Sequence, residues 1–565
     1  MTAAAPTPTK APAAAATPTP TRVIAVTPTP TPAPSIPTPT PKRVPKGILN
    51  TALENLGSES WVVRLTTGVE GPVTAHVFEP LVGYDTETGA YPPTGLAEKW
   101  SAEALPGGGS KWSFTLRKGI QFHGGQGELT SDDVRFSLAE FLKSGSLNPN
   151  AGLFQRWIGK DINNFKVLDK YSFEIHSPET LVTVLRRLSF GYQSSYFAPT
   201  SKKYAEAVGE EAATRRPVGT GPFEFADHKR NQKVTLKALT EHWRIVPSVA
   251  EVNIFIVPEA STRIAMLRTG ATDLAPISVR YKGELEAARL KIFRGQMAME
   301  TFGAFGGMVL NTRPKYDPNQ PWTQGPDPIN EKARLVRQAM NLAIDRQALL
   351  NKIFLGEGFL SSVAFNFQKE GVAWWSPKWK PYLYDPKKAK ELLAQGGYPN
   401  GFETGMWLIK LAAGPENVDA SEAVASFWET NLGLKVNRML TEDRPTVRQR
   451  RIERDTAGWT WLYTNPSVTD PPTYACSSGG PSFSTTLHSE HPKIDELCDK
   501  ILNELDFGKQ SELVRQLGDF WYDNYWHIPL VTGNILFAGG SRIRNYPISP
   551  GSSLMANLEY LTLVP

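Results

Sequence analysis

The first 44 residues consist almost entirely of alanine, threonine and proline, and this composition keeps them out of any folded core. Such a segment cannot bury enough apolar surface to fold, and its prolines favour extended polyproline II. We therefore expect residues 1–46 to form a disordered tether that reaches on the order of 100 Å, at about 3 Å per residue. Folding is then confined to residues 47–565.

The net charge of +5 belongs to this tether. It carries five basic residues and no acid: Lys10, Arg22, Lys42, Arg43 and Lys46. Subtracting these five from the 61 Lys and Arg leaves 56, which equals the 56 Asp and Glu. A neutral folded part argues against nucleic acid as the partner, because phosphate binding needs a basic face.

Met1 is followed by no apolar segment of the kind that starts a secretory signal, and no transmembrane run occurs in the sequence. A long tether makes sense if its start is fixed to a membrane. We therefore expect an exported protein, in the periplasm or on the outer face of the cell membrane, held by a lipidated cysteine upstream of this sequence. A cytosolic protein with a disordered tail is the alternative.

Only two cysteines occur, Cys476 and Cys498, so the sequence contains no CxxC pair and no zinc ribbon. They could remain two free thiols. In an exported protein they could instead form a disulfide, which would stabilise the fold by about 3 kcal/mol in the chain-entropy model.

The stretch AGWTWLYTNPSVTDPP combines alternating aromatic residues with a sharp break. On a strand, Trp459, Trp461 and Tyr463 share one face. The prolines after Asn465 and Asp470 then force an irregular loop. This pattern suits the wall of a ligand cleft, and the alternative is an aromatic core strand followed by a surface turn.

Several other elements are predicted by local signals. Residues 111–117 alternate as a strand with one buried face. Thr130 and Asp133 predict a capping box at the start of a helix. Asp385 and Pro386 predict the start of another helix, as N-cap and first helical residue.

Segments spread along the chain carry a resemblance to a known family. They are EPLVGYDTETGAYPPTGLAEKW (79–100), KWSFTLRKGIQFHGGQGELTSDDVRFSL (111–138), PVGTGPFEF (217–225), RTGATDLAPIS (268–278), VRQAMNLAIDRQALL (336–350), YDPKKAKELLAQGGYPNGF (384–402) and HIPL (527–530). Together they resemble extracellular solute-binding family 5, the peptide-, dipeptide- and nickel-type substrate-binding components of ABC importers. The resemblance covers roughly residues 50–565.

The resemblance implies an α/β protein with the two-lobed periplasmic-binding-protein type II (cluster C) fold, an extra inserted subdomain and a hinge. Lobe I would comprise residues 47–71, 216–278 and 526–565, with the inserted subdomain at 72–215, and lobe II would comprise 279–525. It also implies a monomeric receptor, without a cofactor, that captures a peptide or peptide-like solute by hinge closure and delivers it to a membrane permease.

One position departs from the pattern of the peptide-binding members. They commonly read Gly-Trp-x-x-Asp in the aromatic strand, and that Asp pairs with the amino terminus of the peptide. Here Gly458 and Trp459 match, but Leu462 takes the place of the acid. A leucine cannot pair with an ammonium group. Unless Asp470 replaces it, an N-blocked peptide, an oligosaccharide or another uncharged solute becomes the alternative cargo.

The predicted ligand-binding residues share aromatic character or a place beside the aromatic strand. They are Trp459, Trp461, Leu462, Tyr463, Asn465, Asp470, Trp374, Trp375 and Phe305. The basic run RQRRIER at 448–454 is expected to be a solvated helix face rather than an anion site, because acidic residues are interleaved with it.

The sequence favours binding over catalysis. It contains no GxSxG nucleophile elbow and no phosphate-cradling glycine loop. The segment HSEH at 488–491 lacks the histidine spacing of HExxH, so we expect no metal site. A secreted carbohydrate-active hydrolase is the alternative from another class, because carboxylate pairs cannot be judged from the sequence.

Overall fold

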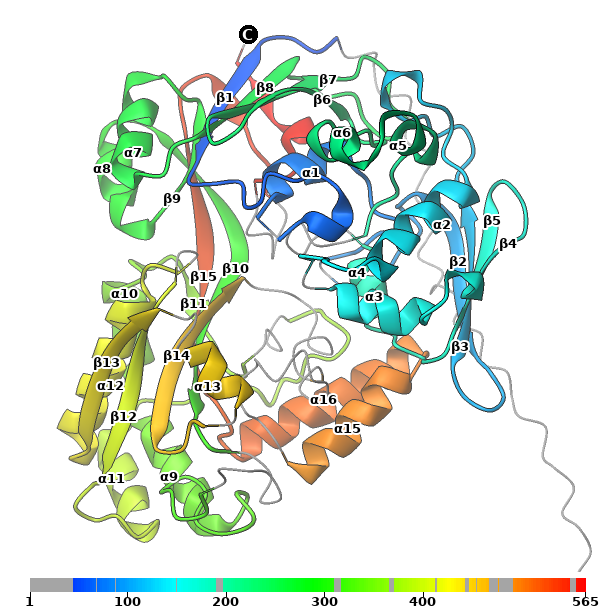
Figure 1. The fold of residues 1–565 in the computed structure, drawn as a ribbon. Coiled ribbons are helices and arrows are strands. Elements are labelled where there is room, and N and C mark those ends of the chain that lie inside the picture. Colours follow the sequence, from blue (N-terminus) through cyan, green and yellow to red (C-terminus); the bar gives the residue numbers. More distant parts are fainter. Residues whose placement is uncertain are drawn as a thin grey trace, which may run out of the picture.

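A computed structural model describes residues 44–564, apart from 68, 87, 149, 190–196, 309–316, 365–369, 412–413, 443–446, 454, 467–475, 477–490 and 549–554. These residues form two lobes joined by two long strands (Figure 1). The strands are β10 (Lys291–Phe305) and β15 (Ile528–Gly539), and they run antiparallel. None of the helices within the described ranges combines the length and the apolar composition that crossing a bilayer requires.

The first lobe surrounds one end of these strands. Its elements are β1 (Ile48–Leu53), α1 (Gly71–Val77), α5 (Lys202–Val208), α6 (Glu210–Arg215), β6 (Phe223–Lys229), β7 (Lys233–Ala238), β8 (Glu251–Ile256), α7 (Ala260–Thr269), β9 (Leu274–Ile277), α8 (Lys282–Ala287), β16 (Ile543–Asn545) and β17 (Thr562–Leu563). A four-stranded unit is attached to it, with β2 (Ala97–Ala104), β3 (Ser110–Leu116), α2 (Ser131–Ala139), α3 (Ala151–Ile158), β4 (Phe165–Val167), β5 (Ser172–Ser177) and α4 (Val184–Arg187).

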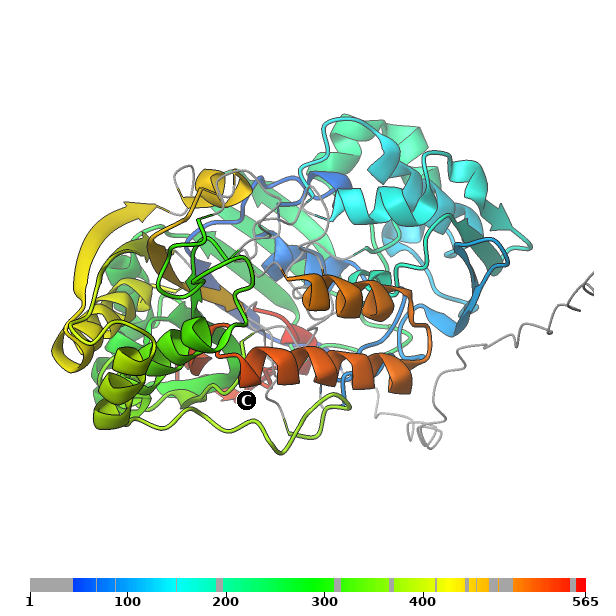
Figure 2. The same ribbon diagram turned by 90° about the horizontal axis from the view of Figure 1, so that it is seen from below.

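The second lobe surrounds the other end. Its elements are α9 (Glu331–Leu342), α10 (Arg346–Lys352), β11 (Gly358–Leu360), α11 (Pro386–Gln395), β12 (Glu403–Lys410), α12 (Asn417–Leu432), β13 (Lys435–Glu442), α13 (Arg448–Ile452), β14 (Trp459–Pro466), α15 (Pro492–Asn503) and α16 (Phe507–Asp523). The two last helices lie side by side and reach from this lobe toward the four-stranded unit (Figures 1 and 2).

A single large sheet passes through both lobes. Its strand order is β13-β12-β14-β10-β15-β9-β1-β8-β7-β6, with β11 added on β15. The crossing between lobes is visible in the pairing, because β15 bonds to β9 over residues 536–539 and to β11 over 531–533. Strand β10 shifts its register between Gly295 and Met299 at the same level. Strand β15 thus changes its neighbour, and β10 its register, at one level between the lobes, and we call this level the hinge region.

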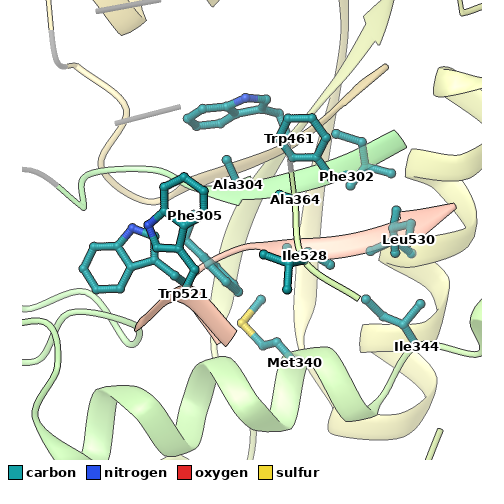
Figure 3. Packing of buried hydrophobic residues seen from close by; sticks show 14 of the residues in the cluster. Phe302, Ala304, Phe305, Met340, Ile344, Ala364, Trp461, Trp521, Ile528 and Leu530 are labelled. Carbon is teal, nitrogen blue, oxygen red and sulfur yellow. The ribbon is translucent and has the colours of Figure 1, made fainter. Parts of the chain in front are cut away.

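Three large hydrophobic clusters form the cores, one in each lobe and one in the four-stranded unit. The cluster of the second lobe contains Phe302 and Phe305 from β10 and Ile528 from β15 (Figure 3). A smaller cluster places Leu285 of α8 beside α7 and β9. Helix α8 therefore packs with the first lobe, although it follows residue 279.

Local signals in the sequence predicted the ends of several elements correctly. Strand β3 buries alternate residues as expected. Thr130 and Asp133 form the predicted capping box of α2. The Asp385 side chain accepts a hydrogen bond from the Lys388 backbone amide at 2.9 Å, so it caps α11.

Candidate ligand-binding face

Strand β14 presents two different faces, as its alternation predicted. In its register with β10, Trp461 lies opposite Ala304, and Leu462 lies opposite Gly303. Figure 3 shows Ala304 and Trp461 on one side of the strands and Met340 of α9 on the other. The predicted site residues of this strand therefore divide between a tryptophan face and a face that packs on helices.

The tryptophan face, called the tryptophan stack below, groups three indole rings, of which Trp407 and Trp459 are stacked and Trp461 is tilted against Trp407. Trp407 of β12, which no sequence signal singled out, stacks on Trp459 with ring centroids 4.9 Å apart. Trp407 also contacts Trp461 at 5.4 Å. Trp407 and Trp461 are fully buried, whereas Trp459 is only partly buried. The stack therefore has a buried base and one ring nearer the surface.

Two arginines of α13 lie on this aromatic face. The guanidinium carbon of Arg450 is 5.9 Å from the centre of the Trp407 ring, and that of Arg451 is 5.2 Å from the Tyr463 ring. Cations attract the faces of aromatic rings at such distances. The prediction of a solvated basic helix is wrong for Arg451, because only 3% of it is exposed. Tertiary packing turned this residue toward the strand.

Leu462 and Phe305 lie on the opposite face and belong to the core. Leu462 is fully buried, and a Cβ atom on Gly303 would stand 2.7 Å from its side chain. Phe305 is 1% exposed and packs on Trp322, with ring centroids 5.7 Å apart. Leu462, where the resemblance would place an acid, is thus an apolar contact of the core.

Trp374 connects the second lobe with the four-stranded unit of the first. A Cβ atom on Gly89 would stand 2.6 Å from the Trp374 ring, so only a glycine leaves room for it. Gly89 has a φ of +77°, a conformation that favours glycine for a second reason. Trp375 is partly buried against the core of the second lobe. Of this tryptophan pair, Trp374 makes the contact between lobes.

The tip of the α15–α16 pair makes another contact between lobes. The Val182 amide donates to the Leu502 carbonyl at 3.4 Å, and Leu505 packs on the cluster of the four-stranded unit. At the hinge, the Ser278 hydroxyl donates to the Glu416 carboxylate at 2.8 Å. The lobes therefore touch at the hinge and again far from it.

Helix α4 of the first lobe lies on the side of the hinge where α13 lies (Figure 1). Arg186 and Arg187 of α4 are 1% and 3% exposed. The Arg186 guanidinium stacks on the Tyr84 ring at 3.7 Å. Arginine–aromatic pairs thus occur on both lobes at this side of the hinge, and no sequence pattern indicated that on the first lobe.

Two predicted residues cannot be placed fully. The backbone of Asn465 belongs to β14, but its side chain and the whole of Asp470 lie outside the described residues.

The structure has a disulfide between Cys476 and Cys498. His491 caps α15, accepting from the Lys493 amide at 3.0 Å. Within the described residues, no group of three or more His, Cys, Asp or Glu side chains is arranged to hold a metal ion.

Comparison with known proteins identifies the family. The profile of the bacterial extracellular solute-binding proteins, family 5 Middle, matches residues 92–485. The chain belongs to this family. It is 27% identical to heme-binding protein A of Haemophilus influenzae over 474 residues, which span 80% of this chain and 81% of the relative. It is 23% identical to the dipeptide-binding protein of Escherichia coli, over 81% of this chain and 84% of that protein.

A solved structure confirms the fold. The periplasmic binding protein DppA of Helicobacter pylori, in complex with the peptide STSA, matches with a TM-score of 0.65 and 21% identity, over 92% of this chain and 98% of that one. The two-lobed type II periplasmic-binding-protein fold predicted from the sequence is therefore correct. The relatives are named as binding proteins, and the cargo in their names differs, being heme in one and a dipeptide in another.

Proposed function

We propose that this protein is an extracytoplasmic receptor that captures a peptide or peptide-like solute between its lobes and delivers it to the permease of an ABC importer. The observation that carries the proposal is the face formed by the partly buried Trp459 and Tyr463 and the half-buried Arg450, on the side of the hinge toward α4. Aromatic rings offer apolar contact to peptide side chains, and a guanidinium offers paired donors to a carboxylate. Clefts at domain interfaces are preferred places for small ligands.

The closing movement follows from the contacts between lobes. A solute that touches both lobes binds the closed form better than the open one, so it shifts the population toward closure. Trp374 against Gly89 is a contact between the lobes far from the hinge, and opening of the lobes would break it. We propose the crossing between lobes near residues 295–299 and 533–535, because α8 packs with the first lobe. The remaining lobe boundaries stay as predicted from the sequence.

The cargo that suits this face lacks a free amino terminus in the usual place. Leu462 points into the core and cannot anchor an ammonium group. This favours an N-blocked peptide or a peptide-like molecule with a carboxylate. An oligosaccharide is the second candidate, because the partly buried Trp459 ring, backed by Trp407, offers a flat surface on which a sugar could stack. Asn465, Asp470 and the lipid anchor stay predictions.

A thermal-shift screen tests the proposal. Free di- to pentapeptides, the same peptides N-acetylated and a set of oligosaccharides are added to the purified protein, since a ligand of the folded form raises the melting temperature with concentration. We expect acetylated peptides to give the largest rise. Free peptides that bind equally well would contradict the inference from Leu462, and a response to sugars alone would make this an oligosaccharide receptor.

A pair of matched variants then tests the location of the site. Tyr463→Leu removes a ring from the face, and Tyr398→Leu makes the same change at a partly buried position of the same lobe, next to Phe402. For a ligand found in the screen, we expect at least tenfold weaker binding for Tyr463→Leu and unchanged binding for Tyr398→Leu. Equal affinities of the two variants would place the ligand elsewhere.

A further inference from the structure

Helices α2, α5 and α6 of the first lobe border a groove that belongs to neither the aromatic face nor the hinge. Its volume is about 170 Å³. The groove is lined by Phe136, Tyr204, Ala205, Ala213 and Val218, and each of these is partly exposed, so a segment arriving from solvent can touch them. An apolar cavity of about 150 Å³ in another protein holds benzene, so this groove has room for a branched aliphatic side chain.

The charged residues that line the groove are mostly acidic. They are Glu140, Glu206 and Glu210, with Lys143 as the cation. Lys143 Nζ already pairs with Glu140 at 2.6 Å and with Glu210 at 3.3 Å. Glu206 is exposed and lies 3.9 Å from Lys202, a loose contact that contributes little. The groove therefore favours a segment that combines apolar side chains with a positive charge.

The tether contains one short segment of this kind. Residues 1–43 lie outside the described residues, and among their alanines, threonines and prolines the sequence Arg22-Val23-Ile24-Ala25-Val26 places a basic residue beside branched apolar ones. The tether carries no acid, so no charge in it opposes an acidic groove. Pro-rich peptides dock in aromatic-lined grooves because their extended form is set before binding, and prolines flank this segment on both sides.

The segment is close enough along the chain to reach the groove. The Ala250 amide donates to the Gly47 carbonyl at 3.0 Å, and the Ala238 amide donates to the Ala250 carbonyl at 2.9 Å. Ala238 is paired with Phe223, so Gly47 lies three strand spacings, or about 15 Å, from Phe223. Val218 is five residues before Phe223 and thus at most about 18 Å farther. The chain from residue 26 to residue 47 spans about 60 Å, which exceeds that distance.

We propose that residues 22–26 of the tether dock in this groove. Val23 and Val26 share one face of a polyproline II helix, which has three residues per turn, and they fill the apolar space. Arg22 then lies beside Glu206. Because the segment is joined to the lobe, its effective concentration is on the order of 1 mM, so the chain's own tether occupies the groove ahead of a free partner.

Docking changes the length of the free tether. Residues 1–21 remain free, and they reach about 60 Å at about 3 Å per residue, where the whole tether reaches more than 100 Å. The docked segment therefore sets how far the lobes can move from the start of the tether. This proposal does not depend on the cargo of the aromatic face, because the two sets of residues do not overlap.

Partial digestion of the full-length protein by trypsin tests the proposal. Lys10 lies outside the segment and Arg22 lies at its start, and neither is followed by proline, so trypsin can cleave after both. Mass spectrometry measures the two initial rates, and a synthetic peptide of residues 1–43 gives their ratio without the groove. We expect cleavage after Arg22, relative to cleavage after Lys10, to be at least fivefold slower in the protein than in the peptide.

Two pairs of matched variants locate the protection. Ala205→Phe fills the groove, whereas Ala207→Phe makes the same change at an exposed position of α5 that does not line it. In the tether, Val26→Ser removes an anchor of the segment, whereas Ile36→Ser makes a similar change outside it. We expect Ala205→Phe and Val26→Ser to restore the ratio of the free peptide, and the other two variants to keep the protection. Glu206→Gln should lower the protection about twofold.

Several outcomes would overturn the proposal. They are an equal ratio in the protein and the peptide, protection that survives Ala205→Phe or Val26→Ser, and a ratio that changes with protein concentration, which would assign the bound segment to a second copy. Melting curves check that Ala205→Phe folds, and Ala213→Phe replaces it if it does not. Val26→Ser lies outside the described lobes, so it keeps the test decisive if neither groove variant folds.

Discussion

Strand β15 is held at its start in the second lobe by a buried arginine bound to neutral oxygen atoms, and at the crossing between the lobes by a cluster of oppositely charged side chains. At its start, Arg346 Nε donates to the Pro529 carbonyl at 2.6 Å. The same guanidinium donates to the carbonyl and the side-chain oxygen of Asn341, at 2.8 and 2.7 Å. Burial lowers the pKa of Arg346 to about 10.

At the crossing, the buried partner is an anion. The Glu357 carboxylate accepts three hydrogen bonds from Arg294 at 3.0–3.2 Å and one from Asn534 at 3.1 Å. Lys282 Nζ lies 2.6 Å from it. Burial alone would raise the pKa of Glu357, but these hydrogen bonds outweigh it and lower the pKa to about 2.

The difference indicates which part of the strand is fixed. Arg346 binds carbonyl oxygens of the backbone, whose positions are set by the fold of one lobe. The Glu357 cluster joins side chains of α8, β10 and β15, and ion pairs keep much of their energy when side chains move a little. An empty space of about 330 Å³, lined by residues of both lobes, lies beside it. We expect closure to bend β15 near residues 533–535 and to leave 528–531 in place.

The largest effect should come from breaking the anchor at the start of the strand. Arg346→Met leaves buried carbonyl oxygens without donors, and we expect the free energy of unfolding to fall by about 3–5 kcal/mol. Urea denaturation measures it. Lys352→Met, at an exposed position at the end of α10, should change it by less than about 0.5 kcal/mol. A loss below about 1 kcal/mol for Arg346→Met would mean that Arg346 does not fix the start of β15 more firmly than the Glu357 cluster fixes the crossing.

The second effect is a pH dependence of the free energy of unfolding that comes from Glu357 at the crossing. The folded pKa of Glu357 is depressed from an ordinary 4.5 to about 2, so its contribution is complete above pH 4.5 and is lost as the pH falls toward 2. That contribution is about 3 kcal/mol by linkage. In Glu357→Gln this stabilisation should be absent at pH 7, and the difference in the free energy of unfolding between the variant and the unchanged protein should shrink on acidification. Parallel stability curves from pH 7 to pH 3 would contradict this.

The third effect concerns the contact far from the hinge. Gly89→Leu places a side chain where the Trp374 ring lies, so closure should become harder and ligand affinity about tenfold weaker. Gly107→Leu is the control, because Gly107 also has a positive φ, of +91°, but has no atom within 4 Å of the added Cβ. If both variants bind alike in a calorimetric titration, the Trp374 contact does not take part in closure.

The smallest effect should come from the hydrogen bond between a neutral hydroxyl and an ionised carboxylate that spans the hinge. Ser278→Ala removes the hydrogen bond to Glu416 and should weaken ligand binding by about 0.5–1 kcal/mol, or twofold to fivefold. Ser426→Ala, whose hydroxyl bonds only within α12 to Glu422, should leave affinity unchanged. An effect above tenfold for Ser278→Ala would mean that the hinge depends on this bond more than on the Glu357 cluster.

Much of the fold could be predicted because its signals are local or repeated. The capping pair Thr130 and Asp133 acts over three residues, and the alternation of residues 111–117 needs only the geometry of one strand. The family pattern, spread over many segments, indicated the two lobes. The face shared by Trp459 and Trp461 followed from the period of a strand.

Other features depend on chain segments that meet only in the folded protein. Trp407 completes the tryptophan stack from a strand about fifty positions earlier, and Arg451 is buried because α13 packs on that stack. The same is true of Leu462 against Gly303 and of Trp374 against Gly89. By itself, the sequence determined the family, the periodic elements and their caps, since these depend on neighbours along the chain. Only the tertiary structure decided which side chains of those elements face the other lobe, because burial is settled by contacts between distant segments.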